Sequence, residues 1–257
     1  MCRWAAYIGA PIYLEEIVTA PGQSLISQSL AAAEGKTPTN GDGFGLAWYG
    51  DREEPGRYHD VLPAWADANL RSLAHQVRSG LFLAHVRAAT GTATSRTNCH
   101  PFWAGRWSFM HNGQAAGYGR FRRKADMAIS DAAYEHRRGT TDSEAIFLMA
   151  LGDGLEADPK GALERATGRM EIWSRETGET PHMRMTVAMS DGARLYVARY
   201  ATDQFAPTLY HRRTAEGRVV VSEPLDRSLT DWEPIPPGSF AAITPDGAEI
   251  SPFRPAV

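Results

Sequence analysis

The sequence has no long apolar segment and only two cysteines. No stretch approaches the roughly 20 apolar residues that cross a bilayer, and the opening segment MCRWAAYIGAPIYLEE is too short and too soon interrupted to be a secretory signal. Cys2 and Cys99 cannot build a disulfide framework, which fits a reducing compartment. We therefore expect a cytoplasmic protein that has no membrane partner.

The sequence also lacks a basic surplus, an internal repeat and a linker. Its formal net charge is -3, whereas nucleic-acid-binding proteins usually carry excess positive charge that neutralises phosphates. Hydrophobic residues make up 43% and charged residues 22% of the 257 positions, which is typical of a globular protein with a substantial core. We expect one domain over residues 2–257, with a small-molecule substrate and no nucleic-acid partner.

The first half of the chain predicts short strands separated by two helices. Gly9 and Pro11 are expected to stop the first strand, and Asp67 and Gly80 to cap and stop the second helix. The segment 117–138 is polar, basic and weakly patterned, which favours a surface excursion. The predicted strands cover residues 2–8, 46–49, 81–86 and 107–111, and the predicted helices cover 24–34 and 67–78.

The second half predicts two helices followed by hairpins. Thr141 and Glu144 have the spacing of a capping box, and the breaker Asp158-Pro159 precedes a helix over 161–175. Strands at both ends of the chain with helices between them predict a layered α+β domain. The later strands are predicted over residues 185–189, 195–200, 219–221 and 240–243.

Cys2 is the most informative single residue. Removal of Met1 would give Cys2 a free α-amino group, and a thiol beside an amine is a self-contained catalytic pair. The reference pKa is about 7.7–8.0 for the amine and about 8.5 for the thiol, so the amine can act as a base near neutral pH. Taken alone, however, a cysteine in a buried first strand is more often a small apolar residue than a nucleophile.

Five short motifs follow Cys2 in a fixed order. They are Asn40-Gly41-Asp42-Gly43-Phe44-Gly45, His85-Val86-Arg87-Ala88-Ala89-Thr90-Gly91, Asn98-Cys99-His100-Pro101-Phe102, His111-Asn112-Gly113 and Thr141-Asp142-Ser143-Glu144. Together with a second-position cysteine, this set resembles the class II glutamine amidotransferases over roughly the first 150 residues. The resemblance is closest to the stand-alone members that lack a fused synthetase, and Ser222-Glu223-Pro224 resembles a later segment of those members.

The resemblance implies three substrate-binding residues, Arg87, Thr90 and Asp142. Arg87 would hold the α-carboxylate of glutamine, which suits a guanidinium because its two parallel donors match two carboxylate oxygens. Asp142 would receive the α-ammonium group, and Thr90 would contact the substrate from the Arg87 motif. Without the motifs, Arg87 reads as an exposed arginine at a strand end and Asp142 as an acid favoured by the helix macrodipole.

The pair Asn112-Gly113 has two compatible interpretations. The resemblance implies an oxyanion hole, in which the Asn112 amide and the Gly113 backbone N–H donate to the tetrahedral oxyanion. The same dipeptide after a strand is the standard signal for a hairpin turn. We expect a turn that holds the two donors beside Cys2.

Other polar residues invite different functions. The histidines at 85, 100 and 111, together with Cys99, match no zinc-ligand spacing, so we expect no metal and no cofactor. His100 would form part of the pocket wall, with no assigned role. The glycines of residues 40–45 lack the spacing of a phosphate loop and more simply let backbone segments approach each other. The basic residues from Arg120 to Lys124, and later Arg137 and Arg138, read as a solvated face.

The resemblance implies the four-layer αββα sandwich of N-terminal-nucleophile hydrolases and a Cys2 γ-glutamyl thioester that water resolves to glutamate. Three functions stay open. The first is a glutaminase that delivers ammonia to a separate synthetase subunit. The second is a stand-alone γ-glutamyl amidohydrolase for a larger compound, similar to the enzyme that removes glutamate during ergothioneine synthesis. The third is a catalytically silent binding protein, and the oligomeric state is not predicted.

Overall fold

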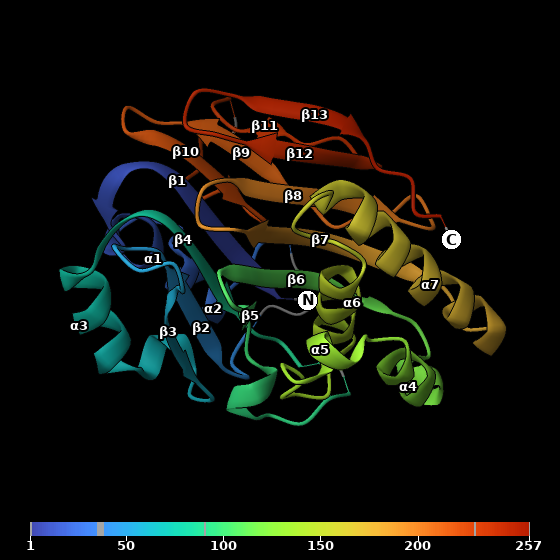
Figure 1. Cartoon of the computed structure of the whole chain (residues 1–257). Helices are drawn as coiled ribbons and strands as arrows, with labels where there is room; N and C mark the ends of the chain where they lie inside the picture. Colours follow the sequence, from blue (N-terminus) through green and yellow to red (C-terminus); the bar gives the residue numbers. More distant parts are fainter. Residues whose placement is uncertain (1, 35–38, 90, 229, 257) are drawn as a thin grey trace.

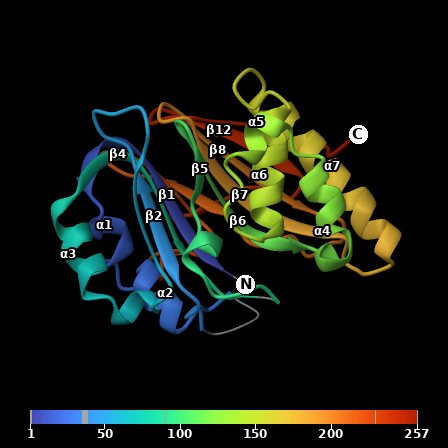
Figure 2. The ribbon, with the colours of Figure 1, turned by 60° about the horizontal axis from the view of Figure 1, so that its bottom comes forward.

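The computed structural model describes residues 2–34, 39–89, 91–228 and 230–256. Its strands form two antiparallel sheets that face each other, and helices cover the outer face of each sheet (Figure 1). Figure 2 shows α1 to α3 on one side of the paired sheets and α4 to α7 on the other. This arrangement is the αββα sandwich that the sequence analysis predicts.

The first sheet has β1 near its centre. Its order over the described residues is β11-β9-β10-β1-β4-β2-β3, and β1 pairs with β10 on one side and β4 on the other. Its strands are β1 (Arg3–Tyr13), β2 (Phe44–Trp48), β3 (Gly56–Asp60), β4 (Arg78–Val86), β9 (Tyr210–Arg213), β10 (Gly217–Val221) and β11 (Glu233–Pro234).

The second sheet places β6 beside β7. Its order over the described residues is β13-β12-β8-β7-β6-β5. Its strands are β5 (Phe102–Ala104), β6 (Trp107–Ala115), β7 (Met183–Ser190), β8 (Leu195–Ala201), β12 (Ser239–Ile243) and β13 (Ala248–Pro252).

The helices divide between the two outer faces. α1 (Glu15–Val18), α2 (Leu25–Leu30) and α3 (Ala68–Gln76) pack on the first sheet. α4 (Tyr118–Met127), α5 (Asp131–Tyr134), α6 (Asp142–Gly152) and α7 (Pro159–Thr177) pack on the second. None of the described helices has the length and apolar character needed to cross a bilayer.

The alternation of side chains along β1 explains why its sheet is buried on both faces. Trp4 and Ala6 belong to the apolar cluster between the sheets, whereas Ala5 and Tyr7 belong to the cluster beneath α1 to α3. All four side chains are fully buried. A strand buried on both faces is held in one register, and β1 therefore gives Cys2, which precedes it, a rigid support.

Local sequence signals correctly predicted the caps of two helices, at Asp67 and Thr141, whereas α7 begins two residues before its predicted start and Asp158, predicted as part of a breaker, caps it. Asp67 accepts a hydrogen bond from the Leu70 N–H at 2.8 Å, and Asp158 accepts one from the Gly161 N–H at 2.9 Å. Thr141 caps α6 by accepting from the Glu144 N–H at 3.2 Å. The predicted later strands are also present, as β7, β8, β10 and β12.

The predicted ends of the first strand and the second helix are wrong. β1 continues through Gly9 and Pro11 to Tyr13, with an irregular register against β4 between Ile8 and Ile12. Such an irregularity tolerates a proline that lacks an N–H donor. Gly80 is not a helix stop, because α3 ends at Gln76 and Gly80 lies inside β4, where an added Cβ would come 2.8 Å from the Gly9 carbonyl oxygen.

The helix predicted over residues 24–34 is shorter than expected. Ser24 caps it, but α2 ends at Leu30. The later N–H groups of Ala33 and Glu34 donate to the Glu223 carboxylate, at 2.9 and 3.0 Å. A distant buried acid therefore replaces the helical hydrogen bonds that this segment would otherwise make.

One further prediction fails because tertiary pairing overrides a local signal, and another is incomplete. Asn112-Gly113 is not a hairpin turn, since both residues lie inside β6 and pair with Thr186 and Met185 of β7. The segment 117–138 lies largely at the surface, as predicted, but its weak pattern did not reveal that it contains α4 and α5. Phe121 anchors α4 in the core beneath α7.

Candidate active site

A cavity of about 450 Å³ brings together residues from distant parts of the chain. Cys2 lies at it, half-buried, together with Arg87, Gly113 and Asp142. Cys2 directly precedes β1, Arg87 directly follows β4, Gly113 lies inside β6 and Asp142 begins α6. The cavity therefore contains a thiol, a cation, an anion and a backbone donor, whereas Asn112, the other predicted catalytic residue, is not among the residues that line it.

Two buried polar side chains hold the segment that carries Cys2. Arg3 donates from Nε to the Glu223 carboxylate at 2.8 Å and from Nη1 to the Cys2 carbonyl oxygen at 2.9 Å. Arg3 is 1% and Glu223 3% exposed. The Trp4 N–H donates to Ser222 Oγ at 2.9 Å. The Ser222-Glu223 segment thus fixes the first residues of β1 from a position more than two hundred residues later.

The Cys2 thiol contacts the backbone that follows β4. Its Sγ lies 3.5 Å from the Ala88 nitrogen, which donates to it, and 3.6 Å from the Ala88 carbonyl oxygen. Burial raises the pKa of the Cys2 thiol, and the Ala88 N–H offsets part of that rise because it favours the thiolate. A buried thiol of this kind needs an adjacent base to become a nucleophile at neutral pH.

Arg87 is 3% exposed and its guanidinium is held by oxygen acceptors. Nη2 donates to Thr92 Oγ1 at 2.7 Å and to the Ala93 carbonyl oxygen at 3.2 Å, and Nη1 donates to the Asp42 carbonyl oxygen at 3.3 Å. None of these acceptors is a carboxylate, so the positive charge is available to an anionic ligand. Thr90, the third predicted substrate-binding residue, lies outside the described residues.

Asp142 is the first residue of α6, where the macrodipole favours an acid. Its Oδ2 accepts from the Ala115 N–H and its Oδ1 from the Ser143 N–H, both at 2.8 Å. These two bonds fix the carboxylate at the cavity wall. The helix-terminal interpretation and the ligand-binding interpretation are thus compatible at this residue.

Gly113 occupies a position in β6 that only glycine suits. Its φ is +154°, and an added Cβ would lie 1.9 Å from the Arg184 carbonyl oxygen. The Asn112 side chain is 1% exposed, and neither its Nδ2 nor its Oδ1 has a partner among the described residues. A buried amide without partners is unusual. By strand alternation Asn112 shares its face with Met110, which packs in the cluster that contains Trp4.

The rings of His85 and His100 are in contact, with centroids 4.2 Å apart and planes tilted by 33°, and His100 lines the cavity. Burial lowers the pKa of His85 to about 3 and lowers that of His100 well below its usual value. Both rings are therefore neutral at physiological pH. The described residues contain no group of three His, Cys, Asp or Glu side chains placed to hold a metal ion.

Cys99 is buried apart from the cavity lining and donates to the Asp60 carbonyl oxygen at 3.4 Å. Burial raises the pKa of its thiol to about 11. The glycines of the first motif pack tightly beside it, as predicted. A Cβ on Gly43 would meet Cys99 Sγ at 2.6 Å, and one on Gly45 would meet the His100 carbonyl oxygen at 2.1 Å.

The basic segment is largely neutralised by ion pairs. On α4, Arg120 pairs with Glu179 and Lys124 with Glu176, and these groups are exposed as expected. Arg137 differs from the prediction of a solvated face. Its side chain is 6% exposed and pairs with Glu144 at 3.0 Å.

The sequence analysis missed several residues of the site. Asp42 supports the loop after β4, because its Oδ2 accepts from the Ala89 N–H at 2.8 Å. Asp42 belongs to the motif of residues 40–45, but a local signal could not reveal its contact with Ala89, which lies 47 positions later. The cavity also extends to Tyr118, Glu179 and Arg184, which no motif marked.

Comparison with protein families finds a match over residues 17–210 to the family model for glutamine amidotransferases class-II. Cys2 lies before the matched region. A probable glutamine amidotransferase of Saccharomyces cerevisiae, DUG3, is 31% identical over 95% of this chain and 82% of that protein. A gamma-glutamyl-hercynylcysteine sulfoxide hydrolase of Mycolicibacterium smegmatis is 30% identical over 98% of this chain and all of that protein.

Solved structures agree with the fold. A glutamine aminotransferase class-II domain protein from Silicibacter pomeroyi is 46% identical, with a TM-score of 0.79 over 99% of this chain and all of that one. The glutamine phosphoribosylpyrophosphate amidotransferase of B. subtilis is 14% identical, with a TM-score of 0.65 over all of this chain and 50% of that one. The second similarity concerns the fold alone.

Proposed function

The chain belongs to the class II glutamine amidotransferase family, and from that membership we propose that Cys2, after removal of Met1, hydrolyses the side-chain amide of glutamine. The observation that carries the proposal is the cavity shared by Cys2, Arg87, Gly113 and Asp142. A thiol nucleophile, a carboxylate-binding cation, an ammonium-binding anion and a backbone donor suffice for this reaction.

The reaction begins with proton transfer from the Cys2 thiol to its own α-amine. The thiolate then attacks the glutamine Cδ, and the carbonyl oxygen becomes an oxyanion. The Gly113 N–H and the Asn112 Nδ2 donate to that oxyanion, and the unpartnered state of the Asn112 amide supports this role. The amide nitrogen takes the proton from the Cys2 α-ammonium group and leaves as ammonia, and the C–N bond breaks to give a γ-glutamyl thioester.

Water completes the cycle. The α-amine takes a proton from a water molecule, whose oxygen attacks the thioester carbon, and the C–S bond breaks to release glutamate. Arg87 and Asp142 bind the α-carboxylate and the α-ammonium group throughout, and so hold the amide carbon near the sulfur. The rings of His85 and His100 are buried and neutral, and they take up no proton in these steps because burial lowers their pKa values.

A comparison of the two cysteines tests the proposal. Wild-type protein should release equal amounts of ammonia and glutamate from glutamine, and Cys2→Ala should release neither. Cys99→Ala is the matched control and should stay active, because the Cys99 thiol is buried and its pKa is raised to about 11. A glutamine-like diazoketone should label Cys2 alone, and intact mass should show that Met1 is absent. Active protein that retains Met1 would exclude the α-amine as base.

A larger γ-glutamyl compound is the second candidate substrate. The cavity continues past the glutamyl-binding residues to Tyr118, Glu179 and Arg184, and about 450 Å³ is more than a single amino acid fills. The relative from M. smegmatis is a hydrolase named for such a compound. The values of kcat/KM for glutamine and for a panel of γ-glutamyl amides decide between the two. A strong preference for a larger amide selects the second candidate, whereas a preference for glutamine favours a separate subunit that accepts ammonia.

A further inference from the structure

Asn98 is a buried residue that the proposed chemistry does not use. It ends the short 3-10 helix η2 (Arg96–Asn98), is 1% exposed, and does not line the cavity. All three hydrogen-bonding groups of its side-chain amide have partners. Those partners lie on two segments that are well separated in the chain.

The first segment carries Arg87. Asn98 Nδ2 donates to the Ala93 carbonyl oxygen at 2.9 Å. The same oxygen accepts from Arg87 Nη2 at 3.2 Å. The position of the Arg87 guanidinium therefore depends on a carbonyl group that Asn98 holds.

The second segment leads into Asp142. Asn98 Oδ1 accepts from the Thr140 N–H at 2.8 Å, and Nδ2 donates to Thr140 Oγ1 at 3.2 Å. Gly139 packs so closely that an added Cβ would lie 2.5 Å from Asn98 Oδ1. Two residues after Thr140, Asp142 begins α6.

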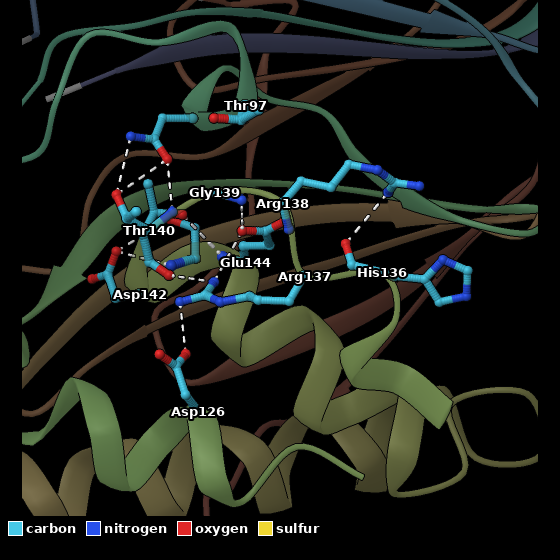
Figure 3. A network of polar contacts seen from close by, with 12 residues as sticks. Thr97, Asp126, His136, Arg137, Arg138, Gly139, Thr140, Asp142 and Glu144 are labelled. Atoms are coloured by element: carbon cyan, nitrogen blue, oxygen red, sulfur yellow. Dashed lines mark hydrogen bonds and ion pairs between the residues drawn. The ribbon is translucent and has the colours of Figure 1, made fainter. Parts of the chain in front are cut away.

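Glu144 holds the same segment from the opposite direction. Its carboxylate accepts from the Gly139 N–H at 2.8 Å and the Arg138 N–H at 2.9 Å, and pairs with Arg137 at 3.0 Å. Figure 3 shows these contacts converging on Glu144, with Thr140 and Asp142 beside it. Because Glu144 fixes this segment to α6, the Asn98 amide is a direct hydrogen-bonded link between the segment and the support of Arg87.

We propose that Asn98 is a positioning residue that sets the distance between Arg87 and Asp142, and this inference rests on the substrate roles proposed for those two residues. Glutamine carries its α-carboxylate and α-ammonium group on one carbon, so both can be bound only if their protein partners keep one separation. A misplacement of about 1 Å can cost roughly 10²-fold. A ligand with only one of the two charges does not depend on that separation.

The test compares one ligand with both charges and two ligands with one charge each. Glutaramate lacks the ammonium group and 4-aminobutanamide lacks the carboxylate, and each serves as a competitive inhibitor of whichever γ-glutamyl amide the wild type cleaves. In Asn98→Ala, KM should rise about 10- to 100-fold while kcat changes less than about threefold. The inhibition constants of the two single-charge ligands should change less than about threefold, because each still finds its own partner.

Asn98→Asp separates the two contacts. The aspartate keeps an acceptor for the Thr140 N–H but has no donor for the Ala93 carbonyl oxygen. KM should therefore rise in Asn98→Asp as well, while the inhibition constants of glutaramate and 4-aminobutanamide should change less than about threefold. Tyr49→Phe is the control for lost buried hydrogen bonding. Tyr49 bonds Ser108 Oγ at 2.8 Å and does not line the cavity, so this variant should keep the wild-type KM.

The outcomes are distinct. The inference is overturned if Asn98→Ala keeps the wild-type KM, if only kcat falls, or if all three ligands weaken alike, which indicates local collapse. Arg87→Ala and Asp142→Asn report on the proposed function in the same assay. If these two leave KM unchanged, or if no γ-glutamyl amide is cleaved, the proposed function fails together with the inference. If they raise KM and Asn98→Ala does not, the inference alone fails.

Discussion

Removal of the Glu223 carboxylate should destabilise the fold and displace Cys2. Glu223 accepts hydrogen bonds from Arg3 Nε and from the N–H groups of Ala33 and Glu34, at 2.8 to 3.0 Å. Arg3 and Glu223 are 1% and 3% exposed. Glu223→Ala leaves the Arg3 guanidinium buried without its counter-charge. It also leaves the N–H groups of Ala33 and Glu34 without their hydrogen-bond acceptor.

The magnitude follows from the cost of breaking a buried ion pair. Deletion of one partner typically costs about 3–5 kcal/mol, because the remaining charge has lost its compensation. For a chain of this size each kcal/mol lowers Tm by about 2–4 °C, so the expected fall is about 6–20 °C. Arg3 also donates to the Cys2 carbonyl oxygen, so loss of its partner should displace Cys2. The kcat of the Glu223→Ala protein that remains folded at the assay temperature should therefore fall.

An exposed ion pair provides the matched control. Lys124 and Glu176 lie 2.7 Å apart with side chains 50% and 55% exposed. Glu176→Ala should therefore cost about 0–1 kcal/mol in urea unfolding. Equal losses in Glu223→Ala and Glu176→Ala, or a loss below about 1 kcal/mol in the former, would refute the reasoning. The double variant Arg3→Met, Glu223→Leu should recover part of the lost stability, because it leaves no unpaired charge.

Two other predictions concern the strand that carries the proposed oxyanion donor and the buried histidines. Gly113→Ala should lower kcat by at least about 10²-fold, since its Cβ would meet the Arg184 carbonyl oxygen at 1.9 Å. Gly119→Ala is the control and should keep the wild-type kcat, because no atom lies within 4 Å of a Cβ added there. Wild-type activity in both variants would contradict the role of Gly113 as oxyanion donor. His85 has its pKa lowered to about 3 in the fold, so the unfolded chain binds more protons below about pH 6.5 and stability must fall as pH drops from about 6.5 toward 3. Between pH 7 and 5 this residue should account for about 2 kcal/mol, measured as the reduced pH dependence of urea unfolding in His85→Phe, and an unchanged dependence would count against it.

Much of the site could be predicted from ordered motifs. Cys2, Arg87, Gly113 and Asp142 do line one cavity, although they lie far apart in the sequence. Their supports could not be predicted in the same way. Glu223 acts on Arg3 across 220 positions, and a single sequence contains no local signal for a contact of that range.

The sequence by itself determined the features that depend on neighbouring residues. Capping by Asp67 and Thr141 and the alternating strands after residue 183 follow from hydrogen bonds and side-chain periodicity within a few positions.

Only the tertiary structure decided how competing local signals resolve. Asn112-Gly113 became the interior of β6 because β7 supplies the partner backbone that a turn would have left unused. The predicted helical hydrogen bonds after Leu30 gave way to the buried Glu223 carboxylate. In both places a backbone donor has two ways to be satisfied, and long-range packing selects between them because an unpaired buried donor is too costly to keep.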